Sequence, residues 1–198
     1  MAKIGIMGGT FNPVHNAHLI IAENALEEFG LDKIMFLPNA MPPHKEMEFY
    51  ISPNSRLELV EAAISGNDRF FLSDFEIAKG GKSYTVDTLN AFKEIYKGDE
   101  LYFIIGGDSL RDFNKWYCPE EIAKLCTLLV YPREDIDIKE HISELSKTYD
   151  AKIFEIHAPR FDISSSMIRQ RVKDGKSIKY LVPQKVHDKI YENKYYIE

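Results

Sequence analysis

The sequence predicts a single-domain α/β fold whose centre is a doubly wound parallel sheet. Six short runs rich in apolar, β-branched and aromatic residues are typical of buried strands, and helical periodicity separates most of them. Strands that alternate with helices in this way favour a parallel sheet. With 198 residues, no repeat and no apparent linker, the chain is expected to form one domain over residues 1–198. The strands are predicted at Ile4–Met7, Lys33–Leu37, Phe70–Ser73, Leu101–Ile105, Thr127–Tyr131 and Lys152–Ile156.

The predicted helices are supported by signals at their ends. Asn16–Phe29 has one apolar face and stops before Gly30, a residue typical of the position just after a helix. Ser55 and Glu58 resemble a capping box that opens a helix at Arg56–Ile64. Further helices are predicted at Val86–Tyr96, Pro119–Leu125, Ile138–Lys147, Ser165–Lys173 and Pro183–Asn193.

Composition excludes several classes of partner. The formal net charge is −6 and no run of lysine or arginine breaks that balance, which argues against a nucleic-acid or anionic membrane partner. Cys118 and Cys126 form neither a C-x-x-C pair nor a disulfide framework. The first residues lack the apolar region of a signal peptide, and no apolar run is long enough to span a membrane. We therefore expect a cytoplasmic protein.

The most informative segment is Gly8–His18, which follows the first strand and enters the first helix. Gly8 and Gly9 let the backbone approach a ligand, and a helix N-terminus offers free N–H groups to an anion. His15 and His18 share one face of the first helical turn. A phosphate site is one interpretation; a tight turn followed by surface histidines is the other. The segment matches neither the G-x-G-x-x-G nor the P-loop template, and zinc would need a third ligand.

Two further segments fall at a strand end or a helix start. Gly106, Gly107 and Asp108 follow the fourth strand, where the glycines could admit an adenine ring and the carboxylate could accept ribose hydroxyls. The alternative is a plain turn. In such sheets ligands bind beyond the carboxyl ends of the strands where strand order reverses, so this segment is expected beside Gly8–His18. Residues 163–169 open a late helix with serine hydroxyls and Arg169, whose forked guanidinium suits phosphate. A capped helix with an exposed arginine is the other interpretation.

A possible carboxylate site precedes the helix at Val86. Ser83, Tyr84 and Thr85 offer hydroxyls and free N–H groups there, although simple helix capping explains them as well. Trp116 is the only tryptophan and is followed by Tyr117; it could stack on a ligand ring or belong to the core.

One long irregular segment separates the second strand from its next helix. It runs from Pro38 to Pro53 with four prolines and carries His44 and Lys45. A loop of that length is often functional. It could cover an active site and bring a cation to phosphate, or cross the surface without a role.

Together these residues resemble a known family. Gly8-Gly9-Thr10-Phe11-x-Pro13-x-His15-x-x-His18, paired with Ile163-Ser164-Ser165-Ser166-x-x-Arg169, is similar to the two-part signature of the nucleotidylyltransferase superfamily. The segments Pro42–Lys45, Ser83–Leu89 and Ile105–Asp108, with Trp116-Tyr117, resemble more narrowly the bacterial nicotinate-nucleotide adenylyltransferases. Asn12 is a departure, because the family commonly has aspartate there.

The resemblance implies a Rossmann-like nucleotidyltransferase fold and the transfer of AMP from ATP to nicotinate mononucleotide, with Mg²⁺ held mainly by the ATP phosphates. It implies catalytic roles for His15, His18, Lys45 and Arg169. It implies ATP contacts from Gly8, Gly9, Thr10, Phe11, His15, His18, Gly106, Asp108, Ser165, Ser166 and Arg169. It implies contacts to the mononucleotide from His44, Lys45, Thr85, Trp116 and Tyr117.

Two competing interpretations remain open from the sequence. A pantetheine-phosphate adenylyltransferase would share the first and last motifs but needs neither a carboxylate site nor a ring-stacking aromatic. A regulatory module that binds ATP without turnover would be consistent with Asn12 but not with retention of both histidines and Arg169. The sequence leaves open whether the chain forms a homo-oligomer.

Overall fold

The computed structural model describes residues 1–40, 51–132 and 138–197. Its centre is a sheet in the order β3-β2-β1-β4-β5-β6, and every neighbouring pair of strands is parallel. The strands are β1 (Lys3–Gly9), β2 (Lys33–Pro38), β3 (Phe70–Leu72), β4 (Glu100–Gly106), β5 (Thr127–Tyr131) and β6 (Ile153–Glu155). The prediction of a doubly wound parallel sheet is confirmed, and strand order reverses between β1 and β4.

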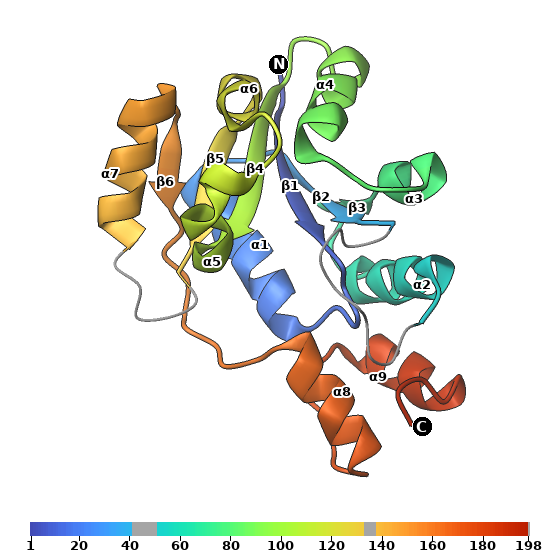
Figure 1. The fold of residues 1–198 in the computed structure, drawn as a ribbon. Coiled ribbons are helices and arrows are strands. Elements are labelled where there is room, and N and C mark those ends of the chain that lie inside the picture. Colours follow the sequence, from blue (N-terminus) through green and yellow to red (C-terminus); the bar gives the residue numbers. More distant parts are fainter. Residues whose placement is uncertain (41–50, 133–137, 198) are drawn as a thin grey trace.

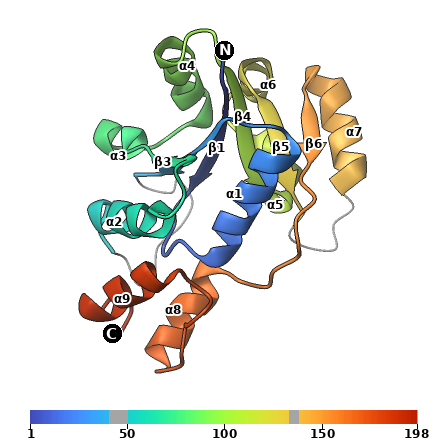
Figure 2. The same ribbon diagram turned by 180° about the vertical axis from the view of Figure 1, so that it is seen from behind.

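Helices cover both faces of the sheet, as Figures 1 and 2 show from opposite sides. They are α1 (Asn16–Glu28), α2 (Pro53–Ile64), α3 (Phe75–Lys79), α4 (Thr85–Ile95), α5 (Gly107–Arg111), α6 (Pro119–Leu125), α7 (Ile138–Tyr149), α8 (Ser165–Lys173) and α9 (Gln184–Glu192), with a 3-10 turn at Phe113–Lys115. Buried residues of α1, α2, α8 and α9 join one apolar core, and those of α4 to α7 join the other. The alternation of Ile6 and Met7 between these cores shows how a strand buried on both faces contributes to each.

Local signals explain most helix boundaries. Gly30 follows α1 with a φ of +59°, the left-handed conformation that glycine adopts without a Cβ penalty. The capping-box prediction at Ser55 is wrong: α2 begins at Pro53, and the Ser52 hydroxyl accepts a hydrogen bond of 3.0 Å from the Ser55 N–H. Pro53 suits the first helical turn because its φ is preset and its missing N–H would have no helical partner there.

Two short helices were not predicted. α3 and α5 each have five residues, too few to show a helical period in the sequence. α5 starts directly at Gly107, so the segment after β4 is the first turn of a helix and not a plain turn. No helix in the described ranges has both the length and the apolar character needed to cross a membrane.

Candidate active site

The turn between β1 and α1 lies at the carboxyl end of the central strand. β1 extends through Gly8 and Gly9, and packing explains part of the glycine requirement. A Cβ at Gly9 would lie 3.1 Å from the Phe11 ring, and one at Gly8 would lie 3.2 Å from the Phe103 ring. Phe11 is buried, with a φ of +48°, and its ring meets the His18 ring edge-on at 5.1 Å. Gly9 therefore makes room for the aromatic ring that supports His18, and Gly8 makes room for Phe103.

The two predicted histidines lie together at the start of α1. His15 is the residue that precedes the helix, and its ring stacks on that of His18 with centroids 3.7 Å apart. The His15 backbone N–H donates to His18 Nδ1 at 3.2 Å. In a neutral His18 ring the proton therefore lies on Nε2, which makes Nε2–H the donor that this side chain can offer a ligand.

The N-terminal turn of α8 packs against the same turn. Ser165 Oγ donates to the Pro13 carbonyl at 2.8 Å, and Arg169 Nη1 donates to the Asn12 carbonyl at 2.8 Å. Ser166 is exposed, with its hydroxyl 3.0 Å from that of Ser164. The structure thus joins the two halves of the predicted motif across more than 150 residues of sequence, with Ser165 and one arm of Arg169 directed to backbone carbonyls.

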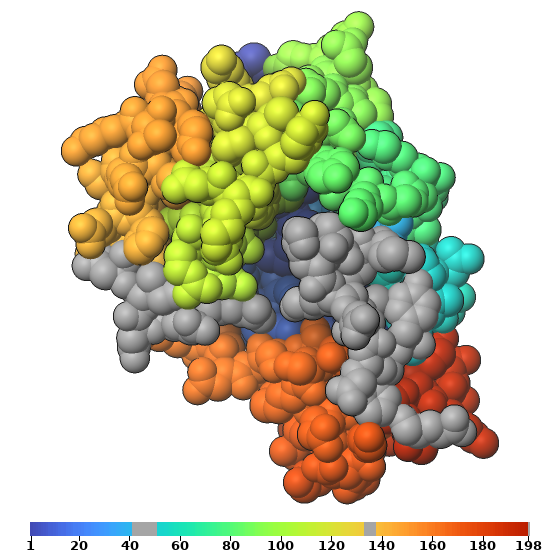
Figure 3. Space-filling model, viewed as in Figure 1, coloured from blue at the N-terminus to red at the C-terminus, as the bar shows by residue number. Residues whose placement is uncertain are grey.

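The segment after β4 borders the same edge of the sheet. β4 pairs directly with β1, and Gly106 ends the strand and caps α5. Asp108 is exposed in the first turn of α5. Figure 3 shows a hollow on this face, in which blue N-terminal residues are visible between the yellow-green segment that follows β4 and the orange α8. The structure therefore places Asp108 and Gly8–His18 at one edge, as the sequence predicts.

The predicted carboxylate site and aromatic segment also meet. Thr85 is the first residue of α4, and the N-cap residue Tyr84 makes no side-chain capping bond to the helix. The rings of Tyr84 and Tyr117 lie 5.1 Å apart, which brings the start of α4 beside the segment after the 3-10 turn. The Trp116 ring is half-buried against Phe113 at 5.5 Å. The tryptophan therefore belongs to the edge of a core, and its remaining surface is what a ligand ring could meet.

A buried carboxyl group supports the start of α4. Glu76 of α3 accepts a hydrogen bond of 2.8 Å from Thr88 Oγ1, and Lys79 pairs with Asp87 at 3.1 Å. Burial raises the pKa of Glu76, while the Thr88 hydroxyl opposes that shift. These contacts anchor the first turn of α4 to α3, which sequence analysis did not predict.

Two side chains outside the predicted set hold the turn between β1 and α1. Arg56 is fully buried, and its guanidinium donates to the Thr10 carbonyl at 2.7 Å and to the carbonyls of Asn39 and Ala40 at 2.7 and 2.9 Å. The Tyr196 hydroxyl donates to Asn12 Oδ1 at 2.7 Å. A backbone carbonyl occurs at every residue, so no sequence signal marks the partners of Arg56.

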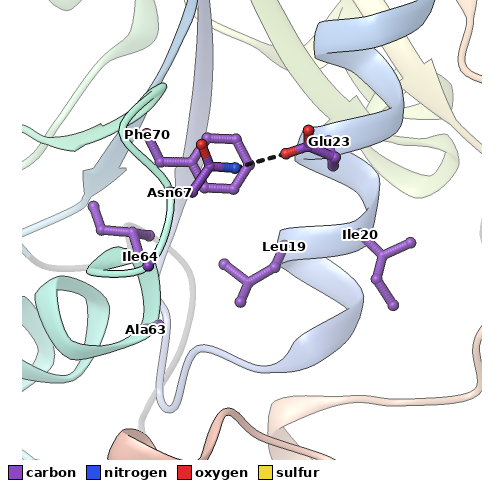
Figure 4. A pocket seen from close by; sticks show the side chains of 8 residues that line it. Leu19, Ile20, Glu23, Ala63, Ile64, Asn67 and Phe70 are labelled. Carbon is purple, nitrogen blue, oxygen red and sulfur yellow. Dashed lines mark hydrogen bonds between the residues drawn. The ribbon is translucent and has the colours of Figure 1, made fainter.

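His44 and Lys45 fall in 41–50, outside the described residues. A pocket between α1 and the end of α2, shown in Figure 4, is lined mainly by apolar side chains such as Leu19, Ile64 and Phe70 and by no residue of the predicted site. Within the described ranges, no group of three or more His, Cys, Asp or Glu is arranged to hold a metal ion.

Comparison with known proteins agrees with this geometry. The cytidylyltransferase-like family model matches residues 6–171. A probable nicotinate-nucleotide adenylyltransferase of Lachnoclostridium phytofermentans is 41% identical over 200 residues, covering 100% of both chains. Another of that name from Dictyoglomus thermophilum is 42% identical over 195 residues, covering 98% of this chain and 100% of the other.

Solved structures share the fold. The nicotinic acid mononucleotide adenylyltransferase of Plasmodium falciparum, complexed with APC, matches with a TM-score of 0.81 at 21% identity, covering 99% of this chain and 98% of that chain. The same enzyme complexed with NaAD matches with a TM-score of 0.81 at 22% identity, with the same coverage. At these identities the likeness concerns the fold alone.

Proposed function

Because this chain belongs to the cytidylyltransferase-like family and, within it, to the nicotinate-nucleotide adenylyltransferases, we propose that it transfers AMP from ATP to nicotinate mononucleotide. The products are deamido-NAD and pyrophosphate. The observation that carries this proposal is the convergence of His15, His18 and the α8 residues Ser165 and Arg169 on one turn at the carboxyl end of β1. Imidazole and guanidinium donors at a helix N-terminus are suited to phosphate oxygens.

The chemistry requires alignment more than proton abstraction. The nucleophile is the phosphate of the mononucleotide, whose second pKa of about 6 leaves it largely ionised at neutral pH. It attacks the α-phosphorus of ATP in line with the departing pyrophosphate, so a P–O bond forms on one side while the P–O bond to the β-phosphate breaks on the other. The site must therefore hold two anions together and stabilise the charge that develops on pyrophosphate.

The ATP side of the site uses the turn and its neighbours. His18 donates from Nε2 and His15 lies stacked behind it, both beside the helix N-terminus that faces the phosphates. Ser165, Ser166 and Arg169 hold the triphosphate from α8. Because the Ser165 hydroxyl donates to the Pro13 carbonyl, Ser165 contributes its backbone N–H at the start of the helix. The remaining ATP contacts are assigned to Gly8, Gly9, Thr10, Phe11 and Gly106, with Asp108 on the ribose hydroxyls.

The mononucleotide side begins at α4. Backbone N–H groups near Thr85 and Tyr117 donate to the nicotinate carboxylate, because an anion suits both N–H donors and the positive end of a helix. The amide of nicotinamide would turn a donor toward those donors, so the acid form is preferred. The exposed part of Trp116 stacks on the pyridinium ring, whose positive charge adds to ordinary stacking. His44 and Lys45 contact the mononucleotide and its phosphate.

We assign Mg²⁺ as the metal, held mainly by the ATP phosphates. The donors of this site are imidazole, guanidinium and N–H groups, which fit phosphate, while Mg²⁺ takes oxygen ligands of the kind that the phosphates themselves provide. When bound there, Mg²⁺ neutralises negative charge on the pyrophosphate leaving group.

The test is pyrophosphate release from Mg-ATP by the purified protein with one of three acceptors. Nicotinate mononucleotide, nicotinamide mononucleotide and phosphopantetheine are compared in parallel at equal concentration. Fast turnover with the nicotinate compound alone supports both the reaction and the carboxylate site. Equal turnover with the nicotinamide compound would refute the carboxylate site, and activity with phosphopantetheine alone would refute the substrate. No release with any acceptor would refute the reaction and leave an ATP-binding module.

A further inference from the structure

Tyr196, near the C-terminus, reaches back to the turn between β1 and α1. Tyr196 lies after α9, is 5% exposed, and donates from its hydroxyl to Asn12 Oδ1 across 184 residues of sequence. Figures 1 and 2 both show α8, α9 and the C-terminus gathered below the start of α1. Burial raises the pKa of Tyr196 well above its usual range, so the hydroxyl stays protonated and acts as a donor.

Asn12 is also buried and lies within the turn between β1 and α1. Its side-chain oxygen accepts a hydrogen bond from the Tyr196 hydroxyl, and its backbone carbonyl accepts one from Arg169 Nη1. The carbonyl of Thr10, two residues before Asn12, accepts a hydrogen bond from Arg56, and the carbonyl of Pro13 accepts one from Ser165. Side chains from α2, α8 and the C-terminus thus hold three of four consecutive residues of one turn.

These hydrogen bonds fix the position of the two histidines that follow the turn. Pro13 and Asn12 are followed within three residues by His15, whose N–H orients His18. A catalytic group displaced by about 1 Å can lose about two orders of magnitude in rate, so the rigidity of the turn affects function directly. The buried hydrogen bond between Tyr196 and Asn12 also fixes the Asn12 rotamer, because in another rotamer both buried polar groups would lack this partner.

We propose that Tyr196 is a positioning residue for ATP phosphate binding, acting through Asn12 on the turn that carries His15 and His18. This inference rests on the proposed function and extends it to a residue outside both motifs. It also accounts for asparagine at position 12: the position needs an acceptor for the Tyr196 hydroxyl, which an amide oxygen supplies as an aspartate would.

The experiment compares Tyr196→Phe, which removes only the hydroxyl, with Tyr195→Phe as a matched control one residue away. Binding of a non-hydrolysable ATP analogue is measured by calorimetry, and kcat and KM are measured for each substrate in the pyrophosphate assay. For Tyr196→Phe we expect analogue affinity and kcat/KM for ATP to fall roughly fivefold to tenfold, the scale of one buried hydrogen bond. The KM for nicotinate mononucleotide should stay within twofold, and Tyr195→Phe should match the wild type throughout.

A double-variant cycle tests whether Asn12 is the intermediary. Asn12→Ala should lose ATP affinity by a similar factor, and adding Tyr196→Phe to it should cost nothing further, because both changes break the same hydrogen bond. Should Tyr196→Phe fail to fold, the pair Asn12→Asp and Asn12→Ala replaces it: the aspartate keeps an acceptor and should bind the analogue within twofold of wild type.

Several outcomes would overturn the proposal. Tyr196→Phe with reduced thermal stability but unchanged ATP affinity would show a purely structural residue. Equal losses toward both substrates would show a general disturbance, and equal losses in Asn12→Asp and Asn12→Ala would exclude the acceptor role. Wild-type protein that binds the analogue but turns over no acceptor would instead refute the proposed function, and the binding data would still decide the role of Tyr196.

Discussion

Replacing His18 tests the catalytic assignment most directly. Its Nδ1 is occupied by the His15 N–H at 3.2 Å, so the side chain has a single donor, Nε2–H, for phosphate. Losing one donor aimed at developing charge costs about two to three orders of magnitude in kcat. Asparagine places its amide near the former Nδ1 and keeps that local hydrogen bond, whereas glutamine extends its amide toward the former Nε2. We therefore expect His18→Ala and His18→Asn to lose about 100-fold to 1000-fold in kcat, and His18→Gln to recover at least about tenfold of that loss.

The assay is pyrophosphate release at saturating ATP and nicotinate mononucleotide, with thermal unfolding measured on each variant. His157→Asn is the control, since His157 is 74% exposed and pairs with Glu28 on α1 away from the turn. Its kcat should stay within twofold of wild type. The reasoning would be refuted if His18→Asn kept kcat within threefold of wild type. Equal activity in the asparagine and glutamine variants would show that the position of the donor does not matter.

Three further predictions follow from buried groups. Arg56→Met should lower the free energy of unfolding by about 3–5 kcal/mol in urea denaturation, because three carbonyls lose a buried charged donor; a loss below about 1 kcal/mol would contradict this. Burial raises the pKa of Glu76, so the folded state binds the proton more tightly than the unfolded state. The stability that this tighter proton binding provides is lost as pH rises through the pKa of the folded state. Unfolding midpoints from pH 4 to 8 should therefore show Glu76→Gln gaining stability relative to wild type as pH rises, and a constant difference would exclude the effect. Burial raises the pKa of Cys126 to about 12, so a thiol reagent at pH 8 should modify Cys118 in the native protein and Cys126 only on unfolding; equal rates for both thiols would contradict the burial.

Elements with a local sequence signal were predicted well. All six strands and the helices α1, α2, α4, α6, α7, α8 and α9 were located, because apolar periodicity, proline at a first turn and serine caps act within a few residues. The prediction failed where the local signal was ambiguous. Ser55 resembled a cap, but Ser52 with Pro53 three residues earlier provided a better one, and the five-residue helix α3 had no period to detect.

For the candidate site, the sequence alone predicted the chemistry and indicated its approximate place. The Gly8–His18 junction and the Ser165–Arg169 helix start combine residue types and spacings that suit phosphate, and parallel topology brings strand ends to one edge. Only the tertiary structure decided what holds that chemistry in place. Arg56 and Tyr196 reach the turn from 46 and 184 residues away. Arg56 donates hydrogen bonds to backbone carbonyls, which every residue possesses. The contribution of the Tyr196 hydroxyl depends on the acceptor that folding buries beside it. No pattern in the chain marks such contacts, because they depend on which distant groups the fold brings together.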